Sequence, residues 1–242
     1  MARPPAVEVA PQVWRIPTVG RNLVNSFAFV DDDGSVTLVD CGLAKAPPRI
    51  VAGLAAMGKR PADVTRILLT HVHPDHAGGA AELSRQTGAD VWLHQDDHPS
   101  ATAGTIVQKP DQRFLLGRLF GRLPDPHFEP FLPGPLLNDG DVLPVAGGVR
   151  IVHTPGHSPG HVSLLHEPTR TLVTGDAMFN FSFRGLSLSP KFLCADFALT
   201  QQTVHRLGEL EYDVAAFTHG PEMTERPRER IRGFLSRLAR DA

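Results

Sequence analysis

One short segment of the sequence gathers histidine and aspartate at spacings suited to metal binding. Residues 70–79 read THVHPDHAGG. His71 and His73 are two apart, so on an extended chain they can point the same way and bind one ion. Asp75 and His76 open the helix that follows and can turn toward a neighbouring ion. Neutral imidazole and carboxylate are ligand types of catalytic zinc sites. A match to this pattern by chance has a probability of about 0.002, so a chance cluster on a solvated loop is a weak alternative.

The segment resembles the His-x-His-x-Asp-His motif of the metallo-β-lactamase superfamily, and later motifs follow in that family's order. Residues 154–161, TPGHSPGH, resemble its second metal motif. Residues 174–176, TGD, resemble the third, and residues 218–220, THG, resemble the fourth. Residues 38–42, LVDCG, match an early Asp-x-Gly segment that lies beside the site in the family. The resemblance extends from Val13 to Gly220 and so includes most of the chain.

The resemblance implies two metal ions, expected to be Zn²⁺, with iron or manganese as alternatives. The implied ligands are His71, His73 and His157 for one ion, Asp75, His76 and His219 for the other, and Asp176 for both. Two such ions would hold a bridging hydroxide that attacks a carbonyl group, since metals lower the pKa of water. Asp75 would orient this nucleophile and transfer its proton.

Other polar residues near the motifs are expected to support the site. Asp40 is expected to hold a backbone group or a ligand histidine, not a metal. His161, in the second motif, is expected to be a supporting or structural residue. His153 is open to a core role, and His94 and His98 are expected to be solvated.

The elements that must position these residues alternate short strands with helices. Strands are predicted at 13–17, 26–30, 36–40, 66–70, 91–94, 142–145, 149–153, 162–165, 171–174 and 214–218. Helices are predicted at 50–57, 77–86, 115–123, 197–210 and 231–238. This order predicts a layered α/β protein whose two halves each carry a sheet. The resemblance implies the αββα form of that fold, a four-layer sandwich of two mixed sheets flanked by helices.

A length of 242 residues fits one large domain or two small ones, and we expect one domain over residues 1–242. Residues 99–135 are rich in Pro and Gly and are predicted to form a lid or insert. An apolar stripe within them and a Phe-rich stretch at 177–193 could wall a substrate pocket. The residues expected there are Leu116, Phe120, Phe179, Phe181 and Phe183. Covering the core is the alternative role for both stretches, and a dimer contact is open for the insert.

The composition favours a small-molecule substrate. Hydrophobic residues make up 41% of the chain, and the formal net charge is -2, so no bulk positive charge would attract nucleic acid or an anionic membrane. Residues 1–11 lack the apolar core of a secretory signal, and two cysteines do not make a disulfide framework. We therefore expect a cytoplasmic monomer or homodimer with neither nucleic-acid nor membrane partners.

The subgroup is indicated by two positions. Asp176 resembles the metal-bridging residue of lactonase, thioesterase and glyoxalase-type members, which β-lactamases of the family generally lack. Phe179 stands where quorum-signal lactonases often carry Tyr, and Tyr212 is the only tyrosine in the chain. The sequence thus predicts a hydrolase that cleaves a carboxylic ester, thioester or lactone, and Phe179 argues against a phenol-assisted lactonase mechanism. The alternative is an iron-dependent oxidoreductase on the same ligands, because imidazole and carboxylate also suit iron.

Overall fold

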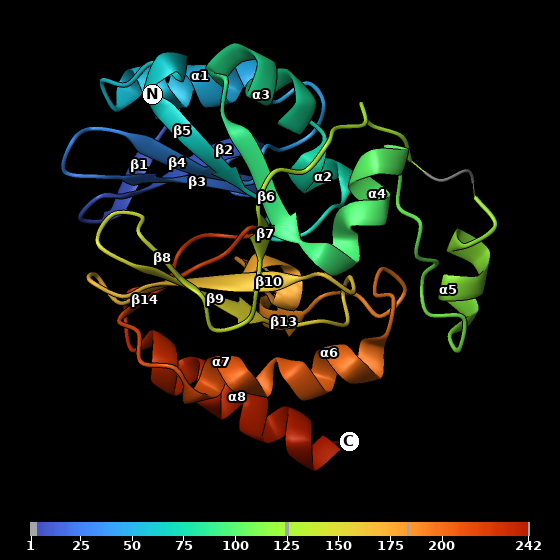
Figure 1. The fold of residues 1–242 in the computed structure, drawn as a ribbon. Coiled ribbons are helices and arrows are strands. Elements are labelled where there is room, and N and C mark those ends of the chain that lie inside the picture. Colours follow the sequence, from blue (N-terminus) through green and yellow to red (C-terminus); the bar gives the residue numbers. More distant parts are fainter. Residues whose placement is uncertain (1–3, 124–125, 183, 242) are drawn as a thin grey trace.

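A computed structural model of the protein describes residues 4–123, 126–182 and 184–241. Two β-sheets pack face to face, with helices on both outer faces (Figure 1). In this view α1 and α3 cover the upper sheet, and α6, α7 and α8 cover the lower one (Figure 1). These four layers are the arrangement predicted from the sequence.

The first sheet has seven strands in sequence order. They are β1 (Val7–Ala10), β2 (Val13–Val19), β3 (Val24–Val30), β4 (Val36–Val39), β5 (Val64–Leu68), β6 (Asp90–His94) and β7 (Leu136–Leu137). The pairs β1–β2, β2–β3 and β3–β4 are antiparallel. The pairs β4–β5, β5–β6 and β6–β7 are parallel. The carboxyl ends of parallel strands share one edge of a sheet, which is where ligands bind in open α/β sheets. The loops that follow β4, β5 and β6 therefore meet at that edge.

The second sheet has five strands in the order β14-β11-β10-β9-β8. They are β8 (Val142–Leu143), β9 (Val149–His153), β10 (Val162–His166), β11 (Thr171–Val173) and β14 (Val214–Ala216). Only the β11–β14 pair among these is parallel. A separate hairpin is formed by β12 (Met178–Phe181) and β13 (Gly185–Leu188).

Helices fill the outer layers and the connections. They are α1 (Pro47–Ala56), α2 (Pro74–Ala77), α3 (Ala80–Thr87), α4 (His98–Ala103), α5 (Leu115–Phe120), α6 (Phe197–Thr203), α7 (His205–Glu209) and α8 (Pro227–Asp241). Within the part of the chain that the structure describes, no helix has the length and apolar character needed to cross a membrane.

The central strands β4 and β5 contribute side chains to two cores, one on each face of the first sheet. Val39 and Leu68 belong to the core between the two sheets. Their neighbours Leu38 and Ile67 belong to the core between the first sheet and α1 and α3. Successive side chains of a strand point to opposite faces, so each of these strands contributes to both cores. A third core joins the second sheet to α6, α7 and α8.

The structure differs from the sequence prediction in several connections. The helix predicted at 77–86 is two helices, α2 and α3, interrupted at Gly78 and Gly79. The helix predicted at 197–210 is likewise two helices, which meet at Val204. Strand β1, helix α4 and the β12–β13 hairpin were not predicted. In the 99–135 region, α5 stands to the side of the sandwich beyond α4 (Figure 1).

Candidate metal centre

The first histidine motif lies in the loop between β5 and α2. Strand β5 ends at Leu68 and α2 begins at Pro74, with His73 as the residue before the helix. This places His71 and His73 on extended chain and Asp75 and His76 in the first turn of the helix. The turn packs closely against the loop after β4, since a Cβ added to Gly79 would lie 2.5 Å from the carbonyl oxygen of Cys41. A larger residue there would push the ligands out of place.

Three histidines from two loops converge on one point. A ring nitrogen from each of His71, His73 and His157 lies within 4.8 Å of the other two. The Nε2 atoms of His71 and His157 are 3.2 Å apart. His157 comes from the loop between β9 and β10 of the second sheet, so this group spans both halves of the sandwich. Its geometry is that of a three-nitrogen site for one ion.

A second group lies beside the first. One ligand atom from each of Asp75, His76 and His219 lies within 4.8 Å of the others. The Oδ2 atom of Asp75 is 3.7 Å from His76 Nε2 and 3.5 Å from His219 Nε2. His219 follows β14 and Asp75 follows β5, so this group also joins the two sheets.

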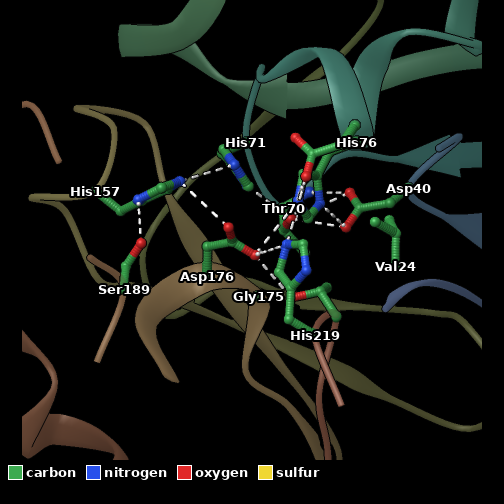
Figure 2. A network of polar contacts seen from close by, with 12 residues as sticks. Val24, Asp40, Thr70, His71, His76, His157, Gly175, Asp176, Ser189 and His219 are labelled. Carbon is green, nitrogen blue, oxygen red and sulfur yellow. Dashed lines mark hydrogen bonds and ion pairs between the residues drawn. The ribbon is translucent and has the colours of Figure 1, made fainter. Parts of the chain in front are cut away.

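Asp176 lies between the two groups. Its Oδ2 atom is 3.4 Å from His157 Nε2 in the first group. Its Oδ1 atom is 3.3 Å from His76 Nε2 and 3.2 Å from His219 Nε2 in the second. Figure 2 shows this carboxylate between His157 on one side and His76 and His219 on the other. The residue is thus placed to share its two oxygens between two ions.

The outward ring nitrogens of the histidines are held by neighbours. The Nδ1 atom of His76 is 2.8 Å from Asp40 Oδ2, and that of His219 is 2.6 Å from the carbonyl oxygen of Leu23. The Nδ1 atom of His157 is 2.8 Å from Ser189 Oγ. Nitrogen Nδ1 of His71 is 3.1 Å from Thr70 Oγ1. Bonds of this kind fix the ring orientation and leave Nε2 directed into the site.

One buried atom indicates that a metal fits this set. His76 Nε2 is buried and has no hydrogen-bond partner among the described residues. Buried polar atoms almost always have a hydrogen-bond partner, so a buried nitrogen that lacks one and faces two carboxylates fits a metal-binding role. Imidazole nitrogen and carboxylate oxygen are also the donors that zinc takes in proteins. The residues present therefore fit the metal that the family typically binds.

The histidines of the site differ in the direction of their pKa shifts. Burial, and then neighbouring histidines, lower the pKa of His71 and His157 well below the ordinary value. Burial also acts to lower the pKa of His76, but Asp176 and two further carboxylates outweigh it and raise that pKa to about 10. The first group is thus neutral and suited to bind metal. The carboxylates that keep a proton on His76 would equally attract a divalent cation, which would displace that proton.

The residues expected to support the site lie around it. Asp40 accepts hydrogen bonds from the backbone N–H and the hydroxyl of Thr70, at 2.8 Å each, besides its contact with His76. His161 is buried, and its Nε2 accepts the backbone N–H of Asp176 at 2.7 Å. Burial lowers the pKa of His161 to about 3, so the ring is a neutral acceptor. It lies outside both groups of converging atoms and holds the Asp176 loop.

His94, His153 and the cysteines belong to neither group, although Cys194 Sγ lies 3.9 Å from His157 Nδ1. The rings of His94 and His153 stack at 4.0 Å with an angle of 14° between their planes. One ligand atom from each of these rings and from Asp96 lies within 4.8 Å of the others. The lone pairs of parallel rings do not converge on one ion, so we assign no metal to this group. Both Cys41 and Cys194 are buried and free.

A largely apolar cavity of about 550 Å³ opens onto the ligands. Its polar lining includes the candidate ligands His73, Asp75, His157, Asp176 and His219, together with Gln108 and Ser158. The apolar residues that line it include Leu43, Ile106, Phe120, Leu123, Phe179, Phe181 and Leu193. Apolar walls with a few converging polar groups are typical of small-molecule sites.

Three of the five residues expected in the pocket line this cavity. They are Phe120, Phe179 and Phe181. The ring of Phe179 also lies 4.6 Å from that of His219. Leu116 is 49% exposed and is not among the described lining residues. Phe183 lies outside the described residues.

Sequence reasoning missed three supporting residues that the fold brings to the site. Ser189 contacts His157, and the Thr218 hydroxyl donates to Asp176 Oδ1 at 2.8 Å. Asp97 accepts hydrogen bonds from both histidine loops. Thr218 precedes a motif histidine, and Asp97 follows a strand adjacent to β5, which are signals available in the sequence. Ser189 offers no such signal.

Comparison with known proteins extends the geometric evidence. A sequence model of the metallo-beta-lactamase superfamily matches residues 19–219. A hydroxyacylglutathione hydrolase, GloC of Haemophilus influenzae, is 32% identical over 115 residues, which cover 47% of this chain and 49% of that protein. A probable metallo-hydrolase of Bacillus subtilis is 25% identical over 85% of this chain and 81% of its own length. An N-acyl homoserine lactonase of Bacillus cereus is 29% identical over 72% of this chain and 63% of its own length.

A solved structure shows the same fold. The Rm3 metallo-beta-lactamase superposes with a TM-score of 0.73 over 98% of this chain and 93% of its own, at 22% identity. At that identity the likeness shows the fold alone. The predicted fold class is confirmed, and so is the family resemblance read from the motifs. The chain belongs to the metallo-beta-lactamase superfamily, whose members are largely metal-dependent hydrolases.

Proposed function

We propose that this protein is a two-metal hydrolase, with zinc as its metal, that cleaves a carboxylic ester, thioester or lactone with an apolar acyl portion. The position of Asp176 carries the proposal. Its two oxygens face two separate groups of ligand atoms, at 3.4 Å on one side and 3.2–3.3 Å on the other. This arrangement supports two adjacent ions in preference to one.

The residues of the site would hold the two ions and move the proton. His71, His73 and His157 would hold one ion, while His76 and His219 would hold the other together with Asp75. Bound metal would supply Lewis acidity toward a carbonyl oxygen and would lower the pKa of water at the site. Asp75 lines the cavity and its side chain is 34% exposed, so its carboxylate can receive a proton from water and pass it to the leaving group.

The walls of the cavity support an uncharged, apolar substrate. Among the described residues that line it, none is Lys or Arg. A substrate recognised through its own carboxylates would therefore find no lysine or arginine side chain there. Phe179 lies against His219 and has no hydroxyl to donate to a developing oxyanion. This supports esters and thioesters at least as well as acyl-homoserine lactones.

The relatives agree with this range of substrates. One is named for hydrolysis of hydroxyacylglutathione, a thioester, and another for an N-acyl homoserine lactone. Both are similar to this chain over part of their length only. They support acyl transfer to water as the reaction class. The substrate itself is proposed from the cavity.

The test is a substrate panel on protein of defined metal content. Apoprotein would be reconstituted with Zn²⁺, Fe²⁺ or Mn²⁺, and the bound metal measured by elemental analysis. We expect close to two ions per chain and turnover of chromogenic acyl esters and thioesters by the zinc form, with β-lactams and RNA inert. One ion or none after reconstitution would contradict the two-metal site. Activity confined to the iron form, with oxygen consumed, would favour the oxidoreductase alternative.

A further inference from the structure

We propose that Asp97 is a positioning residue of the metal centre, specific for the ion held by His71, His73 and His157. The proposal rests on the two-metal site described above. Asp97 ends a short 3-10 helix, Gln95–Asp97, directly after β6. Strand β6 pairs in parallel with β5, so Asp97 lies next to the loop that carries the first motif.

The carboxylate of Asp97 joins the two loops that supply the first group of ligands. Its Oδ2 atom accepts the backbone N–H of Val72 at 3.0 Å and the hydroxyl of Ser158 at 2.8 Å. Its Oδ1 atom accepts the backbone N–H of Gly160 at 2.8 Å. Val72 stands between His71 and His73, and Ser158 follows His157. Asp97 therefore fixes the backbone beside all three nitrogen ligands.

The packing around Asp97 shows that this contact is built into the fold. The side chain is 1% exposed. A Cβ added to Gly160 would lie 2.7 Å from Asp97 Cγ, so only glycine allows the loop to approach this closely. A buried carboxylate that accepts three hydrogen bonds is a strong and directional link, because bonds to a charged acceptor are stronger than neutral ones. It joins a loop of the first sheet to a loop of the second.

A second carboxylate holds the other group in the same manner. Asp40 follows β4, on the opposite side of β5 from β6, and contacts His76 and Thr70. The two aspartates thus flank the motif loop, one on each neighbouring strand. Asp40 contacts His76 of the second group directly and reaches His71 only through the Thr70 hydroxyl, whereas Asp97 supports the loops of the first group. The two ions should therefore respond separately to loss of each aspartate.

The test measures zinc affinity in Asp97→Asn and Asp40→Asn by competition with a chromophoric chelator. Asn keeps the shape of the side chain, but its NH₂ group must face at least one N–H or O–H donor. Loss of a group that orients metal ligands costs about 10–100-fold in metal affinity. We expect Asp97→Asn to lose this factor at one of the two zinc steps and Asp40→Asn to lose it at the other. Co²⁺-substituted Asp97→Asn should also show a changed visible absorption spectrum.

Asp31→Asn is the matched control. Asp31 also joins the sheets, since its Oδ1 accepts the backbone N–H of Ala146 at 2.6 Å. It follows β3, which is antiparallel to β4, so it lies at the end of the sheet away from the metal loops. Asp31→Asn should lower the melting temperature of the apoprotein and leave both zinc affinities and the cobalt spectrum unchanged.

A milder variant keeps the proposal testable if Asp97→Asn does not fold. Ser158→Ala removes one of the three hydrogen bonds and should weaken the same zinc step by a smaller factor. Wild-type zinc affinity and an unchanged cobalt spectrum in a folded Asp97→Asn protein would overturn the proposal. If only Ser158→Ala folds, wild-type zinc affinity in that variant would overturn it. These readouts do not depend on hydrolysis. A failure of the proposed function, with no substrate turned over by the wild type, is therefore distinguishable from a failure at Asp97.

Discussion

Phe120 forms part of the apolar wall of the cavity and offers a quantitative test of acyl recognition. Its ring stacks on Phe192 at 5.0 Å, and the residue is 39% exposed. The exposed part is the surface that an acyl chain can cover. Full burial of a Phe side chain contributes about 1.5–3 kcal/mol, so 39% of it corresponds to about 0.6–1.2 kcal/mol. Phe120→Ala should therefore lower kcat/KM for a long-chain substrate about three- to sevenfold.

The assay is a series of p-nitrophenyl esters from acetate to decanoate. In the wild type, each added methylene that becomes buried contributes about 0.8 kcal/mol, or about fourfold in kcat/KM. The rise should stop when the cavity is full. In Phe120→Ala the decanoate should show the full loss and the acetate almost none, because a two-carbon acyl group buries little apolar surface.

Leu132→Ala is the control for this experiment. Leu132 is 85% exposed and is not among the described lining residues, so its truncation should leave the whole series unchanged. An equal loss for acetate and decanoate in Phe120→Ala would show that Phe120 supports the fold and not the acyl chain. A wild-type series with no dependence on chain length would refute acyl recognition by this cavity.

Four further predictions concern single side chains. His157→Ala should abolish turnover, whereas His161→Ala should keep most of the metal. A rate assay and elemental analysis of both variants test this, and metal loss in His161→Ala alone would reverse the assignment of the two histidines. Asp75→Asn should lower kcat by about 10²–10⁴ with little change in KM, as steady-state kinetics will show. Tyr212→Phe should raise the free energy of unfolding by about 1 kcal/mol in denaturant titrations, because the Tyr212 hydroxyl is buried with no hydrogen-bond partner among the described residues. Hydrogen bonds from a neighbouring arginine lower the pKa of Asp111 to about 2. The free energy of unfolding of the wild type should therefore exceed that of Asp111→Asn above about pH 4, and this difference should disappear as the pH falls toward 2.

The central layers could be predicted from the sequence because their strands are buried on both faces. Three of the five residues are apolar in each of the runs 36–40 and 66–70, and the structure places the strands of these runs in the middle of the first sheet. The β12–β13 hairpin could not be predicted in this manner. Its four-residue strands pair only with each other, and their burial is mixed. Its shape depends on contacts with distant segments, such as the bond from the Asn180 backbone N–H to His219.

The seven candidate ligands were predicted from short motifs, and the structure brings their side chains together. The support around them could not be predicted as fully. Asp97 contacts residues 25 and more positions away in sequence, and Ser189 contacts His157 from 32 positions away. Such contacts depend on which strands are neighbours, and that information is not local. The pocket residues could be predicted only in part, because the lining also depends on contacts that are not local in sequence. Leu116 and Phe120 lie on one short helix, but of these two only Phe120 lines the cavity.

The ligand set extends along the chain from His71 to His219 and draws on loops of both sheets. During synthesis His219 leaves the ribosome long after His71, so a metal ion can meet the complete set only when both sheets have formed and docked. Metal binding would then stabilise the native state alone, and each tenfold excess of free metal over its Kd would add about 1.4 kcal/mol to the free energy of unfolding. Chains that lack metal would unfold more often and be degraded faster. We therefore expect metal starvation of the cell to reduce the abundance of the protein as well as its activity.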